Sequence, residues 1–436
     1  MPLTRPRRPH LALLTSAALI FTTLCLGQTS ATPTTPAAPP LTLPAALVRA
    51  SEGNPRLAAL DATLSASEGL LEQAGQRPAP TLGLSSEDLL GSGDFAGTRR
   101  AQTTVEVSQP LERGGKRAKR LTLAGHERTL AAAEFQVQRN EVLAATALAY
   151  TAALAAEQRL ALAAATRDQS AELLASLTDR VQAGQASPSE TARARIASIA
   201  SQADFARAQA AVATTRASLA SLWGGTRAEL PSLVGELRIP ASLPDDASGL
   251  AALTQNPRLS VQQARIASQR ATVAVAKAQT ASDVTVSAGL RHYQEDGAGA
   301  LVLGFSMPLP MRQYNQGNLR AARATLTGAE QTLVALETEL RADHAAAWLE
   351  LTTAHATVLA LRHEAQPATE AALALVRRGY AQGELPLTEV FDAQRTHTAL
   401  RRELLDAEWA YANALVRLEA LTDPSFTLTS QILSSR

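Results

Sequence analysis

The stretch Arg377-Arg378-Gly379-Tyr380-Ala381-Gln382-Gly383-Glu384-Leu385-Pro386-Leu387-Thr388-Glu389 decides the fold, because a very long helical pattern reverses there. A weaker copy, RVQAGQASPSE, occupies residues 180–190. In both stretches a helix runs into a glycine, which can adopt the left-handed conformation that ends a helix, and a proline soon afterwards starts the next helix. Gly184 precedes Gly383 by 199 residues (383 less 184), and Glu190 precedes Glu389 by the same interval. We therefore predict two helix-to-helix turns in a duplicated chain.

The duplication extends to other parts of the sequence. Asn54-Pro55-Arg56-Leu57 returns as Asn256-Pro257-Arg258-Leu259, and Ser108-Gln109-Pro110-Leu111 is echoed by Ser306-Met307-Pro308-Leu309. Each half reads as a helix, a β-hairpin, a long helix, a turn and a return helix. The predicted organisation is a signal peptide at 1–31, a linker at 32–43, a first repeat at 44–223, an equatorial connector at 224–245, a second repeat at 246–422 and a loosely held C-terminal tail at 423–436.

Two segments change from helical to strand periodicity. In 81–111 and 283–309, apolar residues alternate with small or polar ones on either side of a turn-rich loop. Each strand approaches the ~10 residues that a tilted strand needs to cross a bilayer. Four strands cannot close a transmembrane barrel, since the smallest have about eight. Two copies are the arithmetic minimum and three copies would supply twelve strands; the internal duplication makes a three-fold assembly nearly six-fold, which suits a ring of equivalent helices.

The long helices indicate a multi-chain assembly as well. The helical pattern of roughly 65 to 70 residues before each turn corresponds to about 100 Å, which is too long for one globule. Pro367 interrupts the second of these helices, and we expect a kink there. The predicted fold is mainly α with a small β part: an internally duplicated, coiled-coil-like α-helical barrel, with four strands per chain contributing to a trimeric 12-stranded transmembrane β-barrel.

The N-terminus predicts export. Arg5, Arg7 and Arg8 precede an apolar run from Leu11 to Leu26, and the small residue Ala31 follows where a signal peptidase would cut. The only cysteine, Cys25, lies in this run, so the mature chain can form no disulfide. The 41 basic and 40 acidic residues nearly balance, which argues against a nucleic-acid partner.

Two motifs carry a family resemblance. Residues 305–310 (FSMPLP), leading to Asn315-Gln316-Gly317, and residues 379–384 (GYAQGE), leading to Thr388-Glu389-Val390, resemble those of the TolC-type outer-membrane efflux factors (the OEP family). Within that family they look most like the heavy-metal-efflux, CzcC-like branch. The resemblance covers essentially all of the mature chain. One departure is Val181, where the first copy lacks the aromatic residue that Tyr380 supplies to the second.

The resemblance implies a passive exit duct in the outer membrane that extends into the periplasm. Its expected partners are two further copies of the chain, a periplasmic adaptor (membrane fusion protein), an inner-membrane RND-type pump and outer-membrane lipid. The cargo stays open between metal and drug, with divalent heavy-metal cations favoured. The turns and their adaptor contacts would be formed by Gly184, Gly383, Tyr380, Leu385 and Pro386. Candidate gate charges are Arg180, Glu190, Arg377, Arg378, Glu389 and Asp392.

A purely structural reading stands beside these assignments: glycine and proline could serve only to shape the turns, and the charges could be solvated surface. The sequence supports no enzyme, cofactor or metal site, and we expect His355 and His363, which share one helix, to be exposed. The alternative function is a secreted or periplasmic coiled-coil scaffold or adaptor. An adaptor should carry one helical hairpin between β-rich halves, whereas this chain predicts two hairpins with strands at the opposite end.

Overall fold

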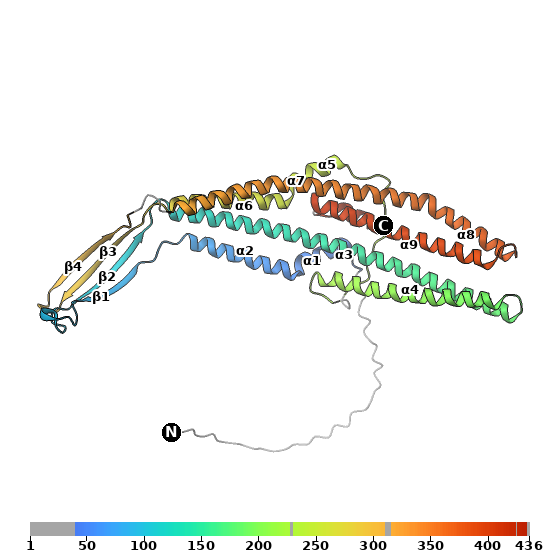
Figure 1. Cartoon of the computed structure of the whole chain (residues 1–436), viewed down its shortest axis with the longest axis horizontal. Coiled ribbons are helices and arrows are strands. Elements are labelled where there is room, and N and C mark those ends of the chain that lie inside the picture. The colour runs from blue at the N-terminus through green and yellow to red at the C-terminus, as the bar shows by residue number, and fades with distance from the viewer. Residues whose placement is uncertain (1–39, 227–229, 310–314, 424, 434–436) are drawn as a thin grey trace, which may run out of the picture. The chain divides into compact units, whose positions relative to one another are not determined.

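The two halves of the chain fold into the same succession of elements (Figure 1). The computed structural model describes residues 40–226, 230–309, 315–423 and 425–433. The predicted signal peptide and Cys25, with most of the predicted linker, lie outside these residues. The first half contains α1 (Leu43–Gly53), α2 (Pro55–Ala74), β1 (Thr81–Glu87), the 3-10 turn η1 (Gly93–Phe95), β2 (Gln102–Leu111), α3 (Lys116–Gln182) and α4 (Pro188–Ser221).

The second half follows a connector. It contains α5 (Asp246–Ala252), the 3-10 turn η3 (Leu253–Gln255), α6 (Pro257–Ala278), β3 (Val284–Tyr293), β4 (Gly299–Ser306), α7 (Gln316–Ala360), the π-helical turn η4 (Leu361–Ala365), α8 (Gln366–Ala381), α9 (Leu387–Thr422) and α10 (Thr427–Ile432). The prediction of a mainly α fold with a small β part is confirmed. Among the described residues, none of the helices combines the length and the apolar composition that a membrane span requires.

The repeated Asn-Pro-Arg-Leu motif performs the same task in both halves. The Oδ1 atoms of Asn54 and Asn256 accept hydrogen bonds from the backbone N–H groups of Arg56 and Arg258, at 2.8 and 2.9 Å, and so cap α2 and α6. Their Nδ2 atoms donate to the carbonyl oxygens at the ends of the two return helices: Leu222 (2.6 Å) and Leu421 (2.9 Å). Each asparagine thus joins the end of a return helix to the start of a shorter one.

The four strands form one antiparallel sheet in the order β1-β2-β3-β4. The pairing of β2 with β3, which runs from Gln102 opposite Tyr293 to Leu111 opposite Val284, joins the two repeats. Residues directly opposite each other share a face, so the register places the alternating apolar and polar positions of all four strands on separate faces. β1 and β4 are the edge strands.

The expected kink before Pro367 takes the form of a π-helical turn. α7 passes into η4, where the backbone adopts a wider turn, and α8 then starts with Pro367 in its first turn. Proline has no N–H to donate, and its ring collides with the carbonyl four residues earlier. A π-helical turn ahead of the proline relieves that collision while the helical path continues.

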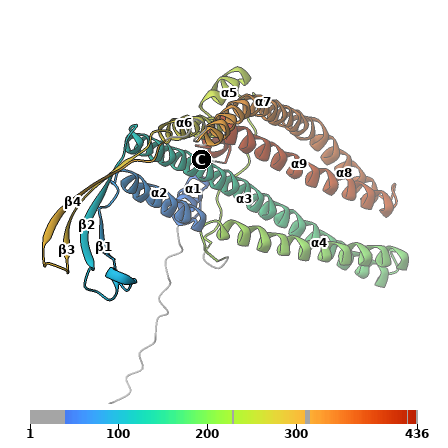
Figure 2. The same cartoon turned by 60° about the vertical axis from the view of Figure 1, so that its left-hand side comes forward.

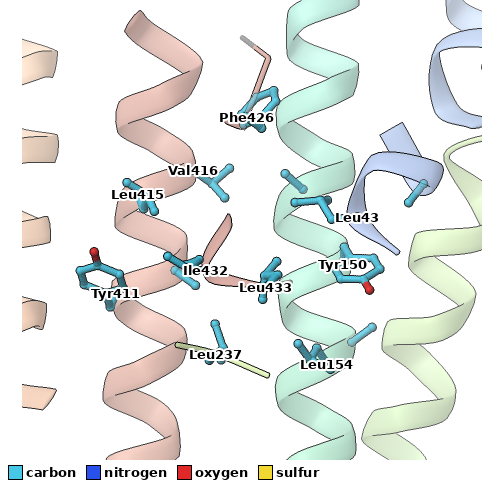
Figure 3. Packing of buried hydrophobic residues seen from close by; sticks show 14 of the residues in the cluster. Leu43, Tyr150, Leu154, Leu237, Tyr411, Leu415, Val416, Phe426, Ile432 and Leu433 are labelled. Carbon is cyan, nitrogen blue, oxygen red and sulfur yellow. The ribbon is translucent and has the colours of Figure 1, made fainter. Parts of the chain in front are cut away.

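The principal core lies where α1, the connector, α3, α9 and α10 meet (Figure 3). Tyr150 of α3 is fully buried, and its hydroxyl lies 2.9 Å from the carbonyl oxygen of Leu41 and 2.5 Å from that of Val234. Burial raises the pKa of Tyr150 to about 12. Leu41 also pairs with Leu233 in a short parallel bridge. The last residues of the predicted linker therefore belong to this core.

Within residues 425–433 the C-terminal segment packs against the core, in contrast to the loosely held tail expected from the sequence. Phe426 is fully buried, and Figure 3 shows Ile432 and Leu433 between α9 and α3. The buried carboxylate of Glu419 accepts hydrogen bonds from the backbone N–H groups of Leu428 (2.6 Å) and Thr429 (2.9 Å). Periodicity did not indicate this packing because α10 is only six residues long.

Candidate functional site

Both predicted turns are closed by a glycine in the left-handed conformation. Gly184 has φ +72° and Gly383 has φ +79°. At the first turn the N–H of Gln185 donates to the carbonyl of Arg180 at 2.8 Å, and at the second the N–H of Glu384 donates to the carbonyl of Gly379 at the same distance. This six-to-one hydrogen bond is the Schellman motif, which satisfies a helix carbonyl that would otherwise have no partner. The two turns are therefore alike in backbone geometry.

The side chains of the two turns differ, and the difference joins them. At the shift of 199, Arg180 aligns with Gly379 and Val181 with Tyr380. Arg180 Nη1 donates to the hydroxyl oxygen of Tyr380 at 2.8 Å, and the guanidinium carbon lies 5.4 Å from the centre of the tyrosine ring. The first turn thus supplies a cation and the second an aromatic ring, which is an attractive pair. The sequence singled out both residues but not their contact.

A small apolar cluster supports this contact. Leu177 and Ala194 from the first turn's helices pack with Leu387 and Val390 of α9, and all four side chains are buried. Tyr380 packs against the edge of the same cluster. The two helical hairpins are consequently held together directly behind their turns.

Gly379 is a feature that the sequence analysis did not assign. A Cβ placed on it would lie 2.7 Å from Cδ1 of Leu385, so a side chain at this position would have to displace the exposed leucine side chain that packs over it. Leu385 and Pro386, two of the predicted contact residues, are exposed beside Gly383. The spacing Gly-Tyr-Ala-Gln-Gly is a signal that could have identified this position, because it places a second glycine one turn earlier in the helix.

The predicted gate charges are not brought together within one chain. Arg377, Arg378 and Glu389 are exposed and form no ion pair among the described residues. Asp392 pairs at 3.0 Å with Arg395 on its own helix. Glu190 lies in the first turn of α4. Of the six predicted charges, Arg180 alone contacts the opposite turn within the described part of the chain.

A second link between the halves lies farther from the turns. Arg402 of α9 pairs with Asp204 of α4 at 2.6 Å, and Arg207 pairs with the same carboxylate. Partial burial alone would raise the pKa of Asp204, but the hydrogen bonds from the two arginines outweigh it and lower that pKa. Asp204 and Arg402 border a hollow of about 560 Å³ between α3, α4 and α9. From the sequence, charges on these helices are expected to be solvent-exposed. The pair could not be predicted, because its two residues are 198 positions apart (402 less 204) and no local pattern connects them.

The sheet has one apolar face and one polar face. The large apolar side chains of the first face are between 39% and 75% exposed: Leu82, Leu84, Val105, Val107, Val286, Leu290, Leu301, Leu303 and Phe305. The opposite face presents mainly small and polar residues: Thr81, Gly83, Ser85, Glu87, Gln102, Thr104, Glu106, Ser108, Ser287, Gly289, Arg291, Gly304 and Ser306. Such a sheet fits an apolar medium on one side and water on the other.

Of the two histidines that were expected to be exposed, His355 and His363, only one is. His363 is exposed, but His355 is 7% exposed, with Nε2 at 2.8 Å from the carbonyl oxygen of Pro240 and its ring tilted against Tyr411. The expectation of an exposed His355 was wrong because the connector covers α7 at this point. Within the described residues, no group of three or more His, Cys, Asp or Glu side chains could hold a metal ion.

Comparison with known proteins gives concordant matches. The family model described as outer membrane efflux protein matches residues 46–225 and 250–423. The cobalt-zinc-cadmium resistance protein CzcC of Cupriavidus metallidurans is 30% identical over 360 residues, which is 83% of this chain and 84% of that protein. The nickel and cobalt resistance protein CnrC of the same organism is 28% identical over 72% of this chain and 77% of its own length.

A solved structure matches the fold. The crystal structure of CusC, from work on its folding and transmembrane channel formation, superimposes with a TM-score of 0.73 and 18% identity. The match covers 87% of this chain and 92% of that one. At this identity the likeness concerns the fold.

Proposed function

Because this chain belongs to the outer membrane efflux protein family, we propose that it is the exit duct through which an efflux system passes divalent metal cations out of the cell. The protein is an outer-membrane efflux channel that extends into the periplasm. Channels of this family are trimeric and work with adaptor and pump partners in general. We propose, in addition, the cargo of this chain, the number of its copies in the channel and the residues that contact each partner.

The observation that carries the proposal is the two-faced sheet with free edges. Leu82, Leu84 and Leu303 are each at least 73% exposed, so the single chain leaves a broad apolar surface in contact with the medium. Transfer of such surface from water to lipid is favourable by roughly 25 cal/mol per Å². In lipid, however, the unpaired backbone groups along β1 and β4 would each cost several kcal/mol. The sheet is stable in a membrane only if other copies pair with both edges.

Three copies would pair β4 of each chain with β1 of the next and close a sheet of twelve strands. The helices support the same order. Figures 1 and 2 agree that α4, α3, α9 and α8 lie in a row, with α4 and α8 at its two edges. The exposed side chains of Ile196 and Ile199 on α4 and of Leu375 on α8 would then meet across the boundary between copies. One head-to-tail interface accounts for both the strand edges and these apolar helix residues.

The proposed cargo rests on the relatives. The printed names of two similar proteins refer to resistance to cobalt, zinc and cadmium and to nickel and cobalt. Because no three metal-ligating side chains converge in the described residues, we propose that the pump and adaptor select the cargo and that this chain conducts it passively, without catalysis. The alternative of a scaffold or adaptor is not supported, since the chain belongs to a channel family.

Adjacent residues on opposite faces of β1 provide a test of the membrane face. Leu84→Lys places a charge on the apolar face and should cost about 2–4 kcal/mol at the membrane midplane, whereas Ser85→Lys adds the same charge to the polar face. We expect Leu84→Lys to abolish heat-resistant trimers in outer-membrane extracts and Ser85→Lys to retain them. Equal yields of trimer from the two variants would refute this orientation.

The cargo is tested in cells that carry the complete efflux system. Deletion of this chain should raise cellular cobalt, zinc or cadmium and lower the tolerated concentration of those metals, with restoration by the wild-type gene. A deletion strain with unchanged metal content but increased sensitivity to organic drugs would contradict divalent metals as the cargo. It would not contradict the function as an exit duct.

A further inference from the structure

The polar face of the sheet carries one carboxylate that has no partner in the described part of the chain. Three side chains of the four strands are charged at neutral pH: Glu87, Glu106 and Arg291. Arg291 Nη2 lies 3.5 Å from the carboxylate of Glu87, and Arg291 also donates to Thr104 (2.9 Å) and Gln102 (3.1 Å). Within the described residues, Glu106 forms no ion pair and no side-chain hydrogen bond. The positive charge is thus neutralised, while the charge of Glu106 is not.

The neighbours of Glu106 on both sides are glycines. In the register, Glu106 lies opposite Gly83 of β1 and opposite Gly289 of β3. A Cβ placed on Gly289 would lie 2.5 Å from the carbonyl oxygen of Val105 and 2.7 Å from Cβ of Glu106, so a larger residue does not fit there. A Cβ on Gly83 would lie 3.6 Å from Oε1 of Glu106, which shows that the carboxylate leans over this glycine. The sheet therefore leaves the carboxylate uncovered by side chains of the adjacent strands.

The face that carries Glu106 is the one that a closed sheet must turn toward water. Its opposite face bears the exposed leucines and Phe305, which fit lipid. Glu106 is the fifth of the ten residues of β2 and thus lies near the middle of the strand. In an assembly of several copies, the carboxylates lie at one level of the lumen, because each comes from the same position of an identical strand.

We propose that Glu106 sets the ion preference of the membrane section of the duct, as a ring of carboxylates that favours cations over anions. The proposal rests on the function proposed above and adds a charge-selecting residue to it. A ring of like charges attracts counter-ions and repels co-ions without binding any of them tightly, so it suits a conduit that must release what it passes. The class of permeant that it favours is the hydrated mono- or divalent cation.

The expected size of the effect follows from Coulomb's law. Three carboxylates about 10 Å from the axis, in water and screened by about 0.1 M salt, change the ratio of cation to anion permeability by about fivefold. Lower salt should increase this effect, because the screening length grows.

The test measures reversal potentials of the full-length protein in a planar bilayer under a KCl gradient. Wild type should favour K⁺ over Cl⁻, Glu106→Gln should bring the ratio down toward one, and Glu106→Asp should retain the preference. Arg291→Gln provides a change of opposite sign: it leaves Glu87 unpaired and should raise the preference for K⁺. Matched single-channel conductance among the variants would show that the pore itself is unchanged.

Four results would overturn the proposal. A wild-type ratio at or below one excludes a cation-selecting ring, and an unchanged ratio in Glu106→Gln assigns the preference to other residues. If the protein forms trimers but every variant conducts anions as well as cations, the role of Glu106 is refuted, while the proposed function as an exit duct is unaffected. A protein that neither forms trimers nor conducts refutes the proposed function and this inference with it.

Discussion

Tyr380→Phe should loosen the contact between the two turns while leaving each turn folded. The change removes the hydroxyl that accepts the 2.8 Å hydrogen bond from Arg180 but keeps the ring beneath the guanidinium. Phenylalanine has nearly the same shape, so the buried cluster of Leu177, Ala194, Leu387 and Val390 keeps its packing. Any effect can therefore be assigned to one hydrogen bond.

The magnitude can be worked out from the geometry. A hydrogen bond to a charged group contributes about 1.5–3 kcal/mol when buried, and solvent reduces this at a partly exposed site to about 1 kcal/mol. A loss of about 1 kcal/mol changes the ratio of linked to separated turns by about fivefold in each chain. If three copies open together, the ratio changes by about two orders of magnitude. Tyr380→Ala should have a larger effect, because the cation–π contact of about 0.5–1 kcal/mol is lost as well.

The assay is single-channel recording in a planar bilayer, combined with a double-mutant cycle. In the proposed gate, links between the turns constrict the duct, so loss of the Arg180–Tyr380 contact should open it. Tyr380→Phe should therefore increase the open fraction, Arg180→Met should do the same, and the double variant should add little to either single change. The thermal midpoint of the trimer controls for general damage and should shift little. Additive effects of the two changes, or an open fraction equal to that of wild type in both, would refute the link.

The remaining predictions concern stability and pH, each checked by thermal unfolding of the purified protein. Asn54→Ala and Asn256→Ala should each lower the free energy of unfolding by about 1–3 kcal/mol, because each removes a helix cap and a hydrogen bond to a carbonyl oxygen at the end of a return helix. Destabilisation by only one of the two substitutions would contradict the equivalence of the two asparagines. Gly383→Ala should destabilise by about 1–2 kcal/mol because of its left-handed backbone, whereas Gly328→Ala, in the middle of α7 with nothing near its Cβ position, should stabilise by up to about 1 kcal/mol. Burial, together with nearby arginines, lowers the pKa of His397 below its usual 6.5, so the unfolded chain binds the proton more readily and stability should fall as pH drops below 6.5. His397→Gln should flatten that dependence, and an equal slope in wild type and variant would exclude His397 as its source.

Much of the candidate site could be predicted because it depends on local sequence. A glycine that ends a helix and a proline that starts the next act within a few residues, so the turns at Gly184 and Gly383 were recognisable from pattern alone. The same holds for the caps at Asn54 and Asn256, which bond to the backbone two residues later. Alternating residues likewise fixed which side chains of each strand share a face.

Contacts between distant segments could not be predicted from the sequence. The periodicity of α4 and α9 treats Asp204 and Arg402 as surface charges, and only the packing of the helices places them 2.6 Å apart. The burial of His355 depends on the connector, whose irregular chain has no period from which its path could be read.

By itself, the sequence determined the duplication, the turns and the two-faced strands, because glycine, proline and residue alternation constrain the backbone over a few residues. The tertiary structure alone decided that Arg180 meets Tyr380, that Phe426 and Ile432 are buried and that Glu106 has no partner among the described residues, because these depend on how separate helices and strands pack. The register between β2 and β3 places Gly289 opposite Glu106, and no local pattern predicts the register between strands that are about 180 residues apart.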